Sequence, residues 1–273
     1  MKIAKLSLII LAVFLLFPAD RARGDGCKLT KGLFERRSAL IAAGGAYRRE
    51  PTDTTATSKE LEGINEWYFQ FMTQVANPES TQVGESECCS DPIEDPVAKI
   101  VCKFVKYLKT GRKDRRLLLE SVPTGPIGRQ ALWALEPIAF FHAERDPENI
   151  PTLFKPSGPV TLYLDVLYRL VSLGDKEAVS KYLEVYLDSD GEHAEQMDDQ
   201  IEDLLKNHSD FVLRQWDIFK PRRKALVRFM AFLPSDEKKL LRSTINASQE
   251  CAVRSEACSE LKTLLSVKTP LRE

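Results

Sequence analysis

The sequence has few of the side chains on which metal binding and acid–base catalysis depend, with three histidines among 273 residues. It contains no H-E-x-x-H, G-x-S-x-G, Walker or G-x-G-x-x-G motif, so the common hydrolase and nucleotide-binding chemistries are not indicated. No alternating run of β-branched residues predicts a sheet. The 39 basic and 40 acidic side chains nearly balance, which gives no overall attraction to nucleic acid. We therefore expect no cofactor, no metal and no nucleic-acid partner.

Residues 1–24 have the pattern of a secretory signal peptide rather than of a folded segment. Lys2 and Lys5 precede an apolar run over 6–17, which is shorter than the roughly 20 residues that a membrane-spanning helix needs. Small residues then precede a cleavage point after Gly24. The sequence therefore predicts export to a periplasm or to the extracellular space, with a retained amphipathic anchor as the alternative.

Six cysteines follow the leader, and an even number in an oxidising compartment predicts disulfides, with zinc and free thiols as the alternatives. If 249–266 is one helix, its two cysteines stand about 10.5 Å apart along the axis, too far for the Cα spacing of a disulfide. Strain excludes a bond between the adjacent Cys88 and Cys89. We expect both C-terminal cysteines to bond to the N-terminal set and so to staple the chain ends together. The candidates are Cys27, Cys88, Cys89, Cys102, Cys251 and Cys258.

Apolar residues recur with the period of an α-helix through most of the chain, so the predicted fold class is all-α. A kink or break is expected at Pro137, because proline lacks the N–H that a helix interior uses. The expected helices cover 29–49, 57–76, 95–109, 126–143, 159–173, 176–187, 193–206, 209–219, 221–233, 235–246 and 249–266.

A proline-rich connector over 147–158 divides the expected helices into two regions. The N-terminal region, 25–146, carries a cysteine-bearing loop, and the C-terminal region, 159–273, is expected to pack on it. Short links between helices predict antiparallel hairpins. The spacing over 159–246 is similar to that of HEAT-like or tetratricopeptide repeats, although the tetratricopeptide consensus is absent and the match to a HEAT signature is too loose to count. A short HEAT-like array and an irregular bundle, stapled by disulfides, both remain open.

Two clusters of opposite charge stand out. The stretch 184–203 holds nine acids and no Lys or Arg, whereas Lys99–Arg116 holds eight bases and one acid. Part of the acidic stretch is expected to be the solvated face of a helix. For the basic cluster, lysine stems covering the margins of a core helix are favoured over contact with a membrane surface. The two clusters together suggest an oppositely charged protein partner or self-association, with intramolecular pairing as the alternative.

The sequence favours a non-enzymatic, exported helical module that binds or scaffolds another protein. No catalytic, cofactor-binding or metal-binding residue is predicted, and neither is an oligomeric state. The alternatives are an unrecognised hydrolase that uses Glu136 and Glu144 near His142, and a structural protein associated with the cell envelope. Asn207 and Asn246 stand in N-glycosylation sequons, which matter only in a glycosylating host.

Overall fold

The computed structural model describes residues 31–42, 56–76, 89, 93–143, 154, 158–189 and 191–266. Within these ranges the chain is mostly helical and has no strand, which confirms the all-α prediction. The expected leader over 1–24 lies outside the described residues. No helix among those described is both long and apolar enough to cross a bilayer.

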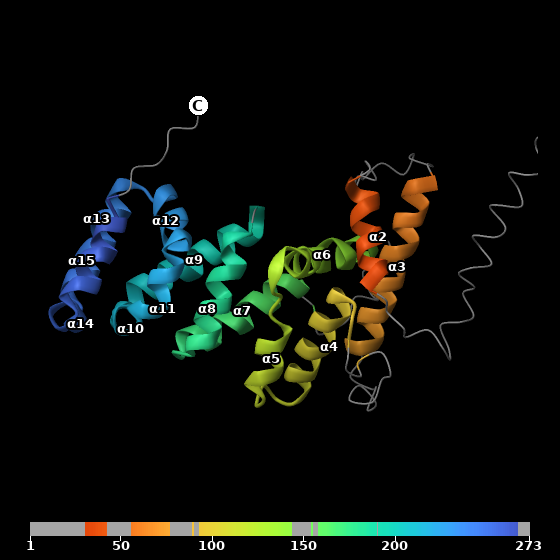
Figure 1. The fold of residues 1–273 in the computed structure, drawn as a ribbon, viewed down its shortest axis with the longest axis horizontal. Helices are drawn as coiled ribbons and strands as arrows, with labels where there is room; N and C mark the ends of the chain where they lie inside the picture. Colours follow the sequence, from red (N-terminus) through yellow and green to blue (C-terminus); the bar gives the residue numbers. More distant parts are fainter. Residues whose placement is uncertain are drawn as a thin grey trace, which may run out of the picture.

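The helices progress along the longest axis of the molecule, from α2 and α3 at one end to α13–α15 at the other, although α6 runs back toward α3 (Figure 1). Most contacts join helices that are close in sequence, such as α2 with α3, α4 with α5 and α7 with α8. The first helices are α2 (Lys31–Ala42), α3 (Ala56–Ala76), α4 (Pro96–Lys109), α5 (Arg115–Ser121) and α6 (Gly125–Ala143). The later helices are α7 (Pro159–Ser172), α8 (Lys176–Leu187), α9 (Gly191–Asn207), α10 (Ser209–Arg214), α11 (Trp216–Phe219), the 3₁₀ turn η4 (Lys220–Arg222), α12 (Arg223–Phe232), α13 (Ser235–Ala247), α14 (Gln249–Val253) and α15 (Ser255–Leu264).

Helix boundaries follow local signals where the sequence supplies them. Asp95 caps α4, because its carboxylate accepts the backbone N–H of Ala98 at 3.0 Å, and proline follows at the first helical position. Asp175 caps α8 in the same way and accepts from the N–H groups of Glu177 and Ala178. Gly174, at φ +88°, follows the last residues of α7 in the left-handed conformation that ends many helices.

Two expected helices differ from the structure, whereas the helix expected over 126–143 forms as one element. Helix α6 continues through Pro137 without the break that was one of the two expected outcomes, and the kink stays a prediction. Pro137 leaves the carbonyl of Trp133 without a helical donor, but buried residues on both sides hold the helix in place, and this packing offsets the lost hydrogen bond. The helices expected over 209–219 and 249–266 are each interrupted, at Gln215 and at Arg254. The buried residues around Pro137 are Leu132, Leu135, Ile138 and Ala139.

The structure corrects the expected disulfide pattern. Cys251 bonds to Cys258, a pair that the sequence-based argument excluded, and Cys89 bonds to Cys102. The exclusion was wrong because it assumed one helix over 249–266, whereas the break at Arg254 brings the two Cα atoms to 5.1 Å. The C-terminal cysteines therefore do not reach back to the N-terminal set, and the expected staple between the chain ends does not form. The exclusion of a Cys88–Cys89 bond is confirmed, and Cys27 and Cys88 lie outside the described residues.

Buried apolar side chains extend through the whole described chain, from Phe34 in α2 to Leu265 after α15. Helix α6 packs on α3 and α4 and also on α7, so helices on both sides of the expected connector over 147–158 are in contact. Of that connector, Phe154 and Gly158 are described, and the division of the chain into two regions stays a prediction.

Two buried polar pairs join the N-terminal helices. The guanidinium of Arg37 in α2 donates to Oδ1 of Asn65 in α3 at 2.8 Å. The hydroxyl of Tyr68 in α3 donates to Oδ2 of Asp95 at the start of α4, at 2.6 Å. Burial raises the pKa of the Asp95 carboxyl above its ordinary value, because the ionised form loses hydration. Each pair satisfies polar groups that would be costly to bury alone, so together they fix the packing of α2, α3 and α4.

Candidate binding groove between α9 and α12

Helix α9 forms the acidic wall of a groove. Its residues Met197, Ile201 and Leu204 are buried in the core, at the spacing of one face of a helix. Four acidic residues at spacings of three, one and three lie along another face of the helix, where residues three and four apart are neighbours. They are Glu195, Asp198, Asp199 and Glu202.

The end of α12 forms the apolar wall. Phe229 and Phe232 stand about one turn apart, and Leu233 follows directly after the helix. With the four acids of α9 they line a hollow of about 370 Å³. Phe229 is 2% exposed and packs into the core, whereas Phe232 is 60% exposed. The ring of Phe232 therefore offers apolar contact area beside a row of carboxylates.

Two of the four carboxylates have no cationic partner among the described residues. Glu202 pairs with Lys206 in the next turn of α9, and Asp198 accepts a hydrogen bond from the hydroxyl of Tyr186. No described Lys, Arg or His nitrogen forms an ion pair with Glu195 or Asp199. The acidic wall therefore carries negative charge that the described part of the chain does not neutralise.

Asp198 is the most enclosed acid of this wall. Burial raises the pKa of its carboxyl above the ordinary value, although the hydrogen bond from Tyr186 and the charge of Arg228 act in the opposite direction. Arg228, on α12, is the basic residue that acts on this carboxylate. Its guanidinium donates to the carbonyls of Tyr186 at 2.7 Å and Leu187 at 3.0 Å, and it stacks on the Tyr186 ring. Arg228 thus donates to carbonyl groups at the C-terminal end of α8, where the helix dipole favours a cation.

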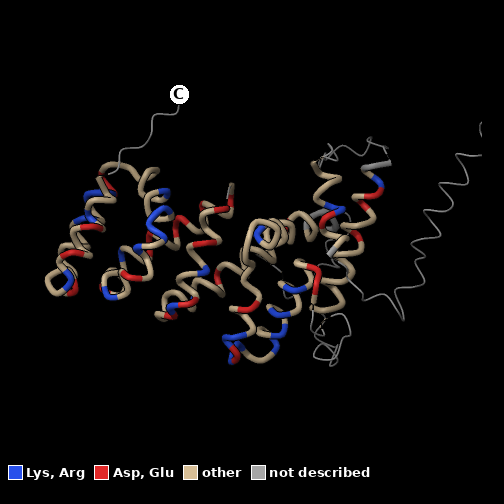
Figure 2. Tube along the Cα trace, in the orientation of Figure 1, with Lys and Arg blue, Asp and Glu red and all other residues tan. Residues whose placement is uncertain are grey.

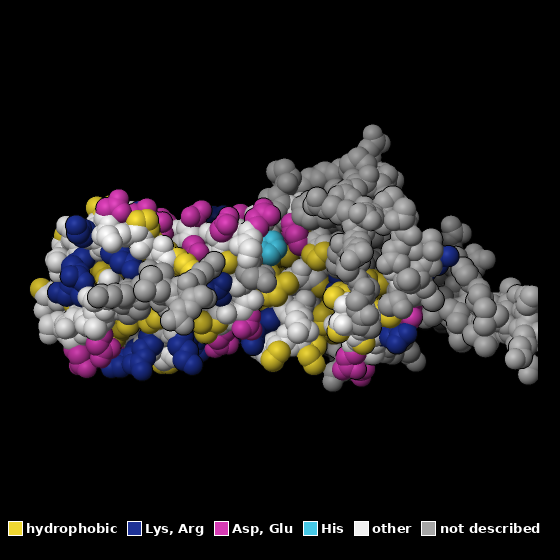
Figure 3. All heavy atoms as spheres, turned by 90° about the horizontal axis from the view of Figure 1, so that it is seen from above, with side chains coloured by type: hydrophobic (Ala, Val, Ile, Leu, Met, Phe, Trp, Pro, Cys, Tyr) yellow, Lys and Arg dark blue, Asp and Glu magenta, His cyan; other side chains and the backbone are white. Residues whose placement is uncertain are grey.

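Elsewhere acids and bases pair more evenly. Figure 2 shows acidic positions concentrated on α9 and basic positions at the turn between α4 and α5, with both signs interspersed on other helices. Figure 3 shows acidic side chains gathered along one long edge of the C-terminal half. Outside α9 several carboxylates have a close cation. Examples are Glu60 with Arg36, Asp175 with Arg115, and Glu260 with Lys220.

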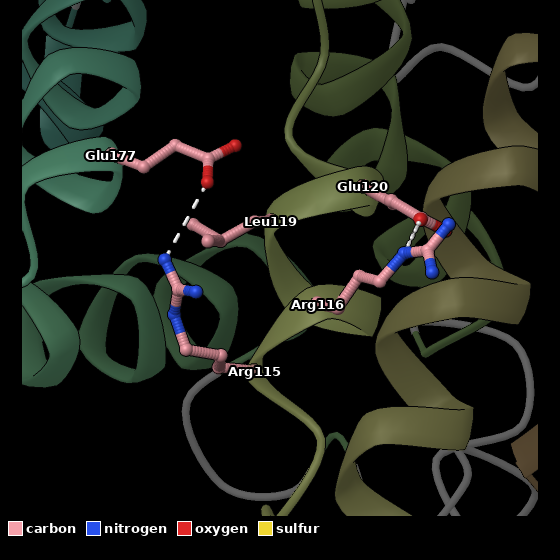
Figure 4. Close-up of a pocket in the computed structure, with 5 residues that line it drawn as sticks. All are labelled: Arg115, Arg116, Leu119, Glu120 and Glu177. Carbon is pink, nitrogen blue, oxygen red and sulfur yellow. Dashed lines mark hydrogen bonds and ion pairs between the residues drawn. The ribbon is translucent and has the colours of Figure 1, made fainter.

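A second hollow, of about 350 Å³, lies at the N-terminal end of α5 beside α8. Arg115 reaches toward Glu177 and Arg116 toward Glu120, with Leu119 between them (Figure 4). Arg115 also pairs with Asp175 at 2.6 Å. Because these charges neutralise one another, the second hollow has less charge to offer a ligand.

The basic cluster Lys99–Arg116, which includes part of this second hollow, has intramolecular partners at several positions. Lys103 pairs with Glu120 at 3.3 Å, and the Lys109 ammonium donates to the carbonyl of Val75 at 3.2 Å. These contacts agree with the interpretation that lysines in this cluster support a core helix.

The residues suggested for a hydrolase do not form a described catalytic group. The carboxylate of Glu136 accepts the backbone N–H of Val160 at 3.0 Å and lies against Gly158, so it holds the start of α7. Burial raises the pKa of the Glu136 carboxyl above its ordinary value. Glu144 and the side chain of His142 lie outside the described residues. The described His193 stacks on Trp133, with ring centroids 5.4 Å apart.

Sequence reasoning found the acids of the groove but missed its aromatic residues. The buried stripe of α12 contains Ala225, Leu226, Phe229 and Met230. Phe232 lies off that stripe, which is the signal that could have marked it as exposed. Its position opposite α9 depends on how α9 and α12 pack, and a single helix does not encode that pairing.

Comparisons with protein families, with characterised proteins and with solved structures found no match to this chain.

Proposed function

We propose that this protein is an exported, non-enzymatic helical module that binds another protein in the groove between α9 and α12. The observation that carries the proposal is the exposed ring of Phe232 beside the carboxylates of Glu195 and Asp199, which lack a cationic partner among the described residues. An exposed aromatic residue next to a hollow provides contact area, and the acids give that contact a preferred charge.

The partner chemistry that fits this groove is a basic segment that also carries apolar residues. Lys or Arg side chains would pair with the acidic wall, and their stems or guanidinium groups would lie over the Phe232 ring. Apolar side chains of the same segment would cover Leu233 and the edge of Phe229. An acidic segment would meet like charge along α9, so the groove also selects against the wrong partner.

The proposed scaffold is a short HEAT-like array of antiparallel helical hairpins. Helices that follow one another in order along one axis, with contacts between near neighbours, support this arrangement over an irregular bundle. Export is part of the proposal as well. It is supported by the Cys89–Cys102 and Cys251–Cys258 disulfides, which persist in oxidising compartments, together with the leader pattern over 1–24.

Calorimetric titration of the full chain with two synthetic peptides tests the groove. One peptide is an amphipathic helix of Lys and Leu, and the other has the same pattern with Glu in place of Lys. We expect the basic peptide to bind and the acidic peptide not to bind. Exchanging Glu195→Lys together with Asp199→Lys should weaken binding of the basic peptide by at least about tenfold, because attraction becomes repulsion across the groove.

Matched controls distinguish binding in the groove from an effect of total charge and from nonspecific hydrophobic binding. Glu94→Lys with Asp217→Lys changes the net charge equally at exposed acids on other elements, and should leave binding unchanged. Phe232→Ala should weaken binding about tenfold, whereas Leu173→Ala removes a 75% exposed side chain elsewhere and should not. Equal binding of both peptides, or undiminished binding by the charge-reversed groove, would show that the groove does not select a basic segment.

A further inference from the structure

The segment 249–264 bends where its own sequence contains no helix-breaking residue. It has neither glycine nor proline, yet α14 ends at Val253 and α15 begins at Ser255. Arg254, between them, has φ −113° and ψ 58°, outside the helical region. Helix propensity does not explain the break at Arg254 between α14 and α15, which we call the corner. A tertiary constraint must therefore hold it.

The Cys251–Cys258 disulfide is that constraint. Its Cα atoms are 5.1 Å apart, whereas residues seven apart in a continuous helix rise about 10.5 Å along the axis. A disulfide requires Cα atoms within about 7 Å. The bond and a continuous helix over 249–264 therefore exclude each other.

The two arms of the corner are held unequally. Helix α15 is anchored by buried Cys258 and Leu261, and Glu260 accepts from Trp216 Nε1 and from Lys220, each at 2.7 Å. Helix α14 has no buried residue. Its Cys251 is only half-buried against the core, and its polar contacts are with α10. They are Arg214 with Glu250 at 3.4 Å, and Asp210 with the hydroxyl of Ser248 and the N–H of Glu250.

We infer that Cys251–Cys258 is a redox-sensitive device in which reduction allows α14 to leave α10 and join α15 as one helix. A dithiol reductant supplies the electrons. One of its thiolates attacks Sγ of Cys251, because Cys251 is half-buried whereas Cys258 is only 1% exposed. The S–S bond then breaks, and Cys258 leaves as a thiolate. The second thiolate of the reductant then attacks the mixed disulfide, and Cys251 leaves. Both protein thiolates take up protons, and the reductant departs as a disulfide.

Amide hydrogen exchange at Ser255, Glu256 and Ala257 distinguishes the two states. These residues form the first turn of α15, where the N–H groups have no acceptor one turn earlier. In a continuous helix they would bond to the carbonyls of Cys251, Ala252 and Val253. We expect their exchange to slow by about tenfold when the wild-type chain is reduced with dithiothreitol, since a helical hydrogen bond must then open before exchange.

A double variant and a matched control separate this disulfide from the other. Cys251→Ser with Cys258→Ser should show the same slowing without reductant. Cys89→Ser with Cys102→Ser keeps the corner oxidised and should leave exchange at 255–257 unchanged. Amides of buried Tyr163 and Leu167 in α7 report the rest of the fold and should stay protected throughout.

Unchanged or faster exchange at 255–257, in either the reduced wild type or the Cys251→Ser/Cys258→Ser variant, would overturn the inference. So would loss of protection in α7 on breaking this bond, because the disulfide would then hold the whole fold rather than one corner.

Discussion

Replacing Asp95 with Ala should lower the free energy of unfolding by about 3 kcal/mol, because it removes the cap of α4 and the acceptor of a buried hydroxyl at once. Asp95 is 0% exposed, and it accepts from the N–H of Ala98 and from the hydroxyl of Tyr68. Without the carboxylate, Tyr68 would be left buried with an unsatisfied donor. Chemical denaturation followed by circular dichroism measures the change.

Asp95→Asn is the matched control, because asparagine caps a helix about as well as aspartate. The amide keeps an oxygen for Ala98 and so keeps the cap, whereas its NH₂ group replaces the oxygen that accepts from the Tyr68 hydroxyl and can only donate to that hydroxyl. We expect this variant to lose less stability than Asp95→Ala, by at least about 1 kcal/mol. A loss from Asp95→Ala no larger than that from Asp95→Asn would show that the cap does not stabilise α4.

The same pair of proteins should differ in pH dependence. The pKa of Asp95 is raised in the folded state by burial, so between the ordinary carboxyl pKa and that raised value the folded chain holds a proton that the unfolded chain has released. Through this residue the wild type therefore gains stability as pH falls through that window, and loses it as pH rises. Asp95→Asn should lack this contribution. An identical pH profile for the two proteins would contradict the raised pKa.

Replacing Gly158 with Ala should also lower the free energy of unfolding by about 3 kcal/mol, from backbone strain and a lost hydrogen bond. Gly158 has φ +77° and ψ 161°, a region essentially restricted to glycine. A Cβ atom there would overlap the carboxylate of Glu136, which accepts the N–H of Val160 at the start of α7. Thermal or denaturant unfolding measures the loss.

Gly63→Ala is the control for this substitution. Gly63 lies in the interior of α3 with open space around its Cα, so alanine there should be neutral or stabilising by about 0.5–1 kcal/mol. Equal stability of the two glycine variants would mean that the contact between Gly158 and Glu136 has no structural role.

The sequence predicted α7 and α8, whose ends carry local chemistry, but it missed the short α5, which Asp114 caps. Asp175 and Gly174 mark a helix start and a helix end with side-chain and backbone signals that act within a few residues. The break at Arg254 has no such signal, because it is imposed by a bond between cysteines on both sides of it. The error at the C-terminal cysteines therefore arose where a covalent bond outweighed a local preference for helix.

The groove was predictable only in part, because one of its walls follows from a local sequence pattern and the other from the packing of two helices. The excess of acids over 184–203 is visible in the chain, and the burial of Met197 and Ile201 follows from helical period. The approach of Phe232 to those acids requires α9 and α12 to pack side by side. No local sequence pattern predicts that the two helices pair. Charge patterns thus located one wall of the groove, and the structure located the other.

Site-specific photo-cross-linking from position 232, in the cells from which the protein comes, is the sharpest test of the proposed groove. A photoreactive phenylalanine analogue replaces Phe232 in one chain and the exposed Leu173 in another, and the cross-linked peptide is sequenced. We expect position 232 to capture a defined segment rich in Lys or Arg, and we expect Glu195→Lys with Asp199→Lys to abolish the product. Capture of a segment no more basic than those obtained from position 173, or a product that survives the charge reversal, would rule out a basic partner in the groove.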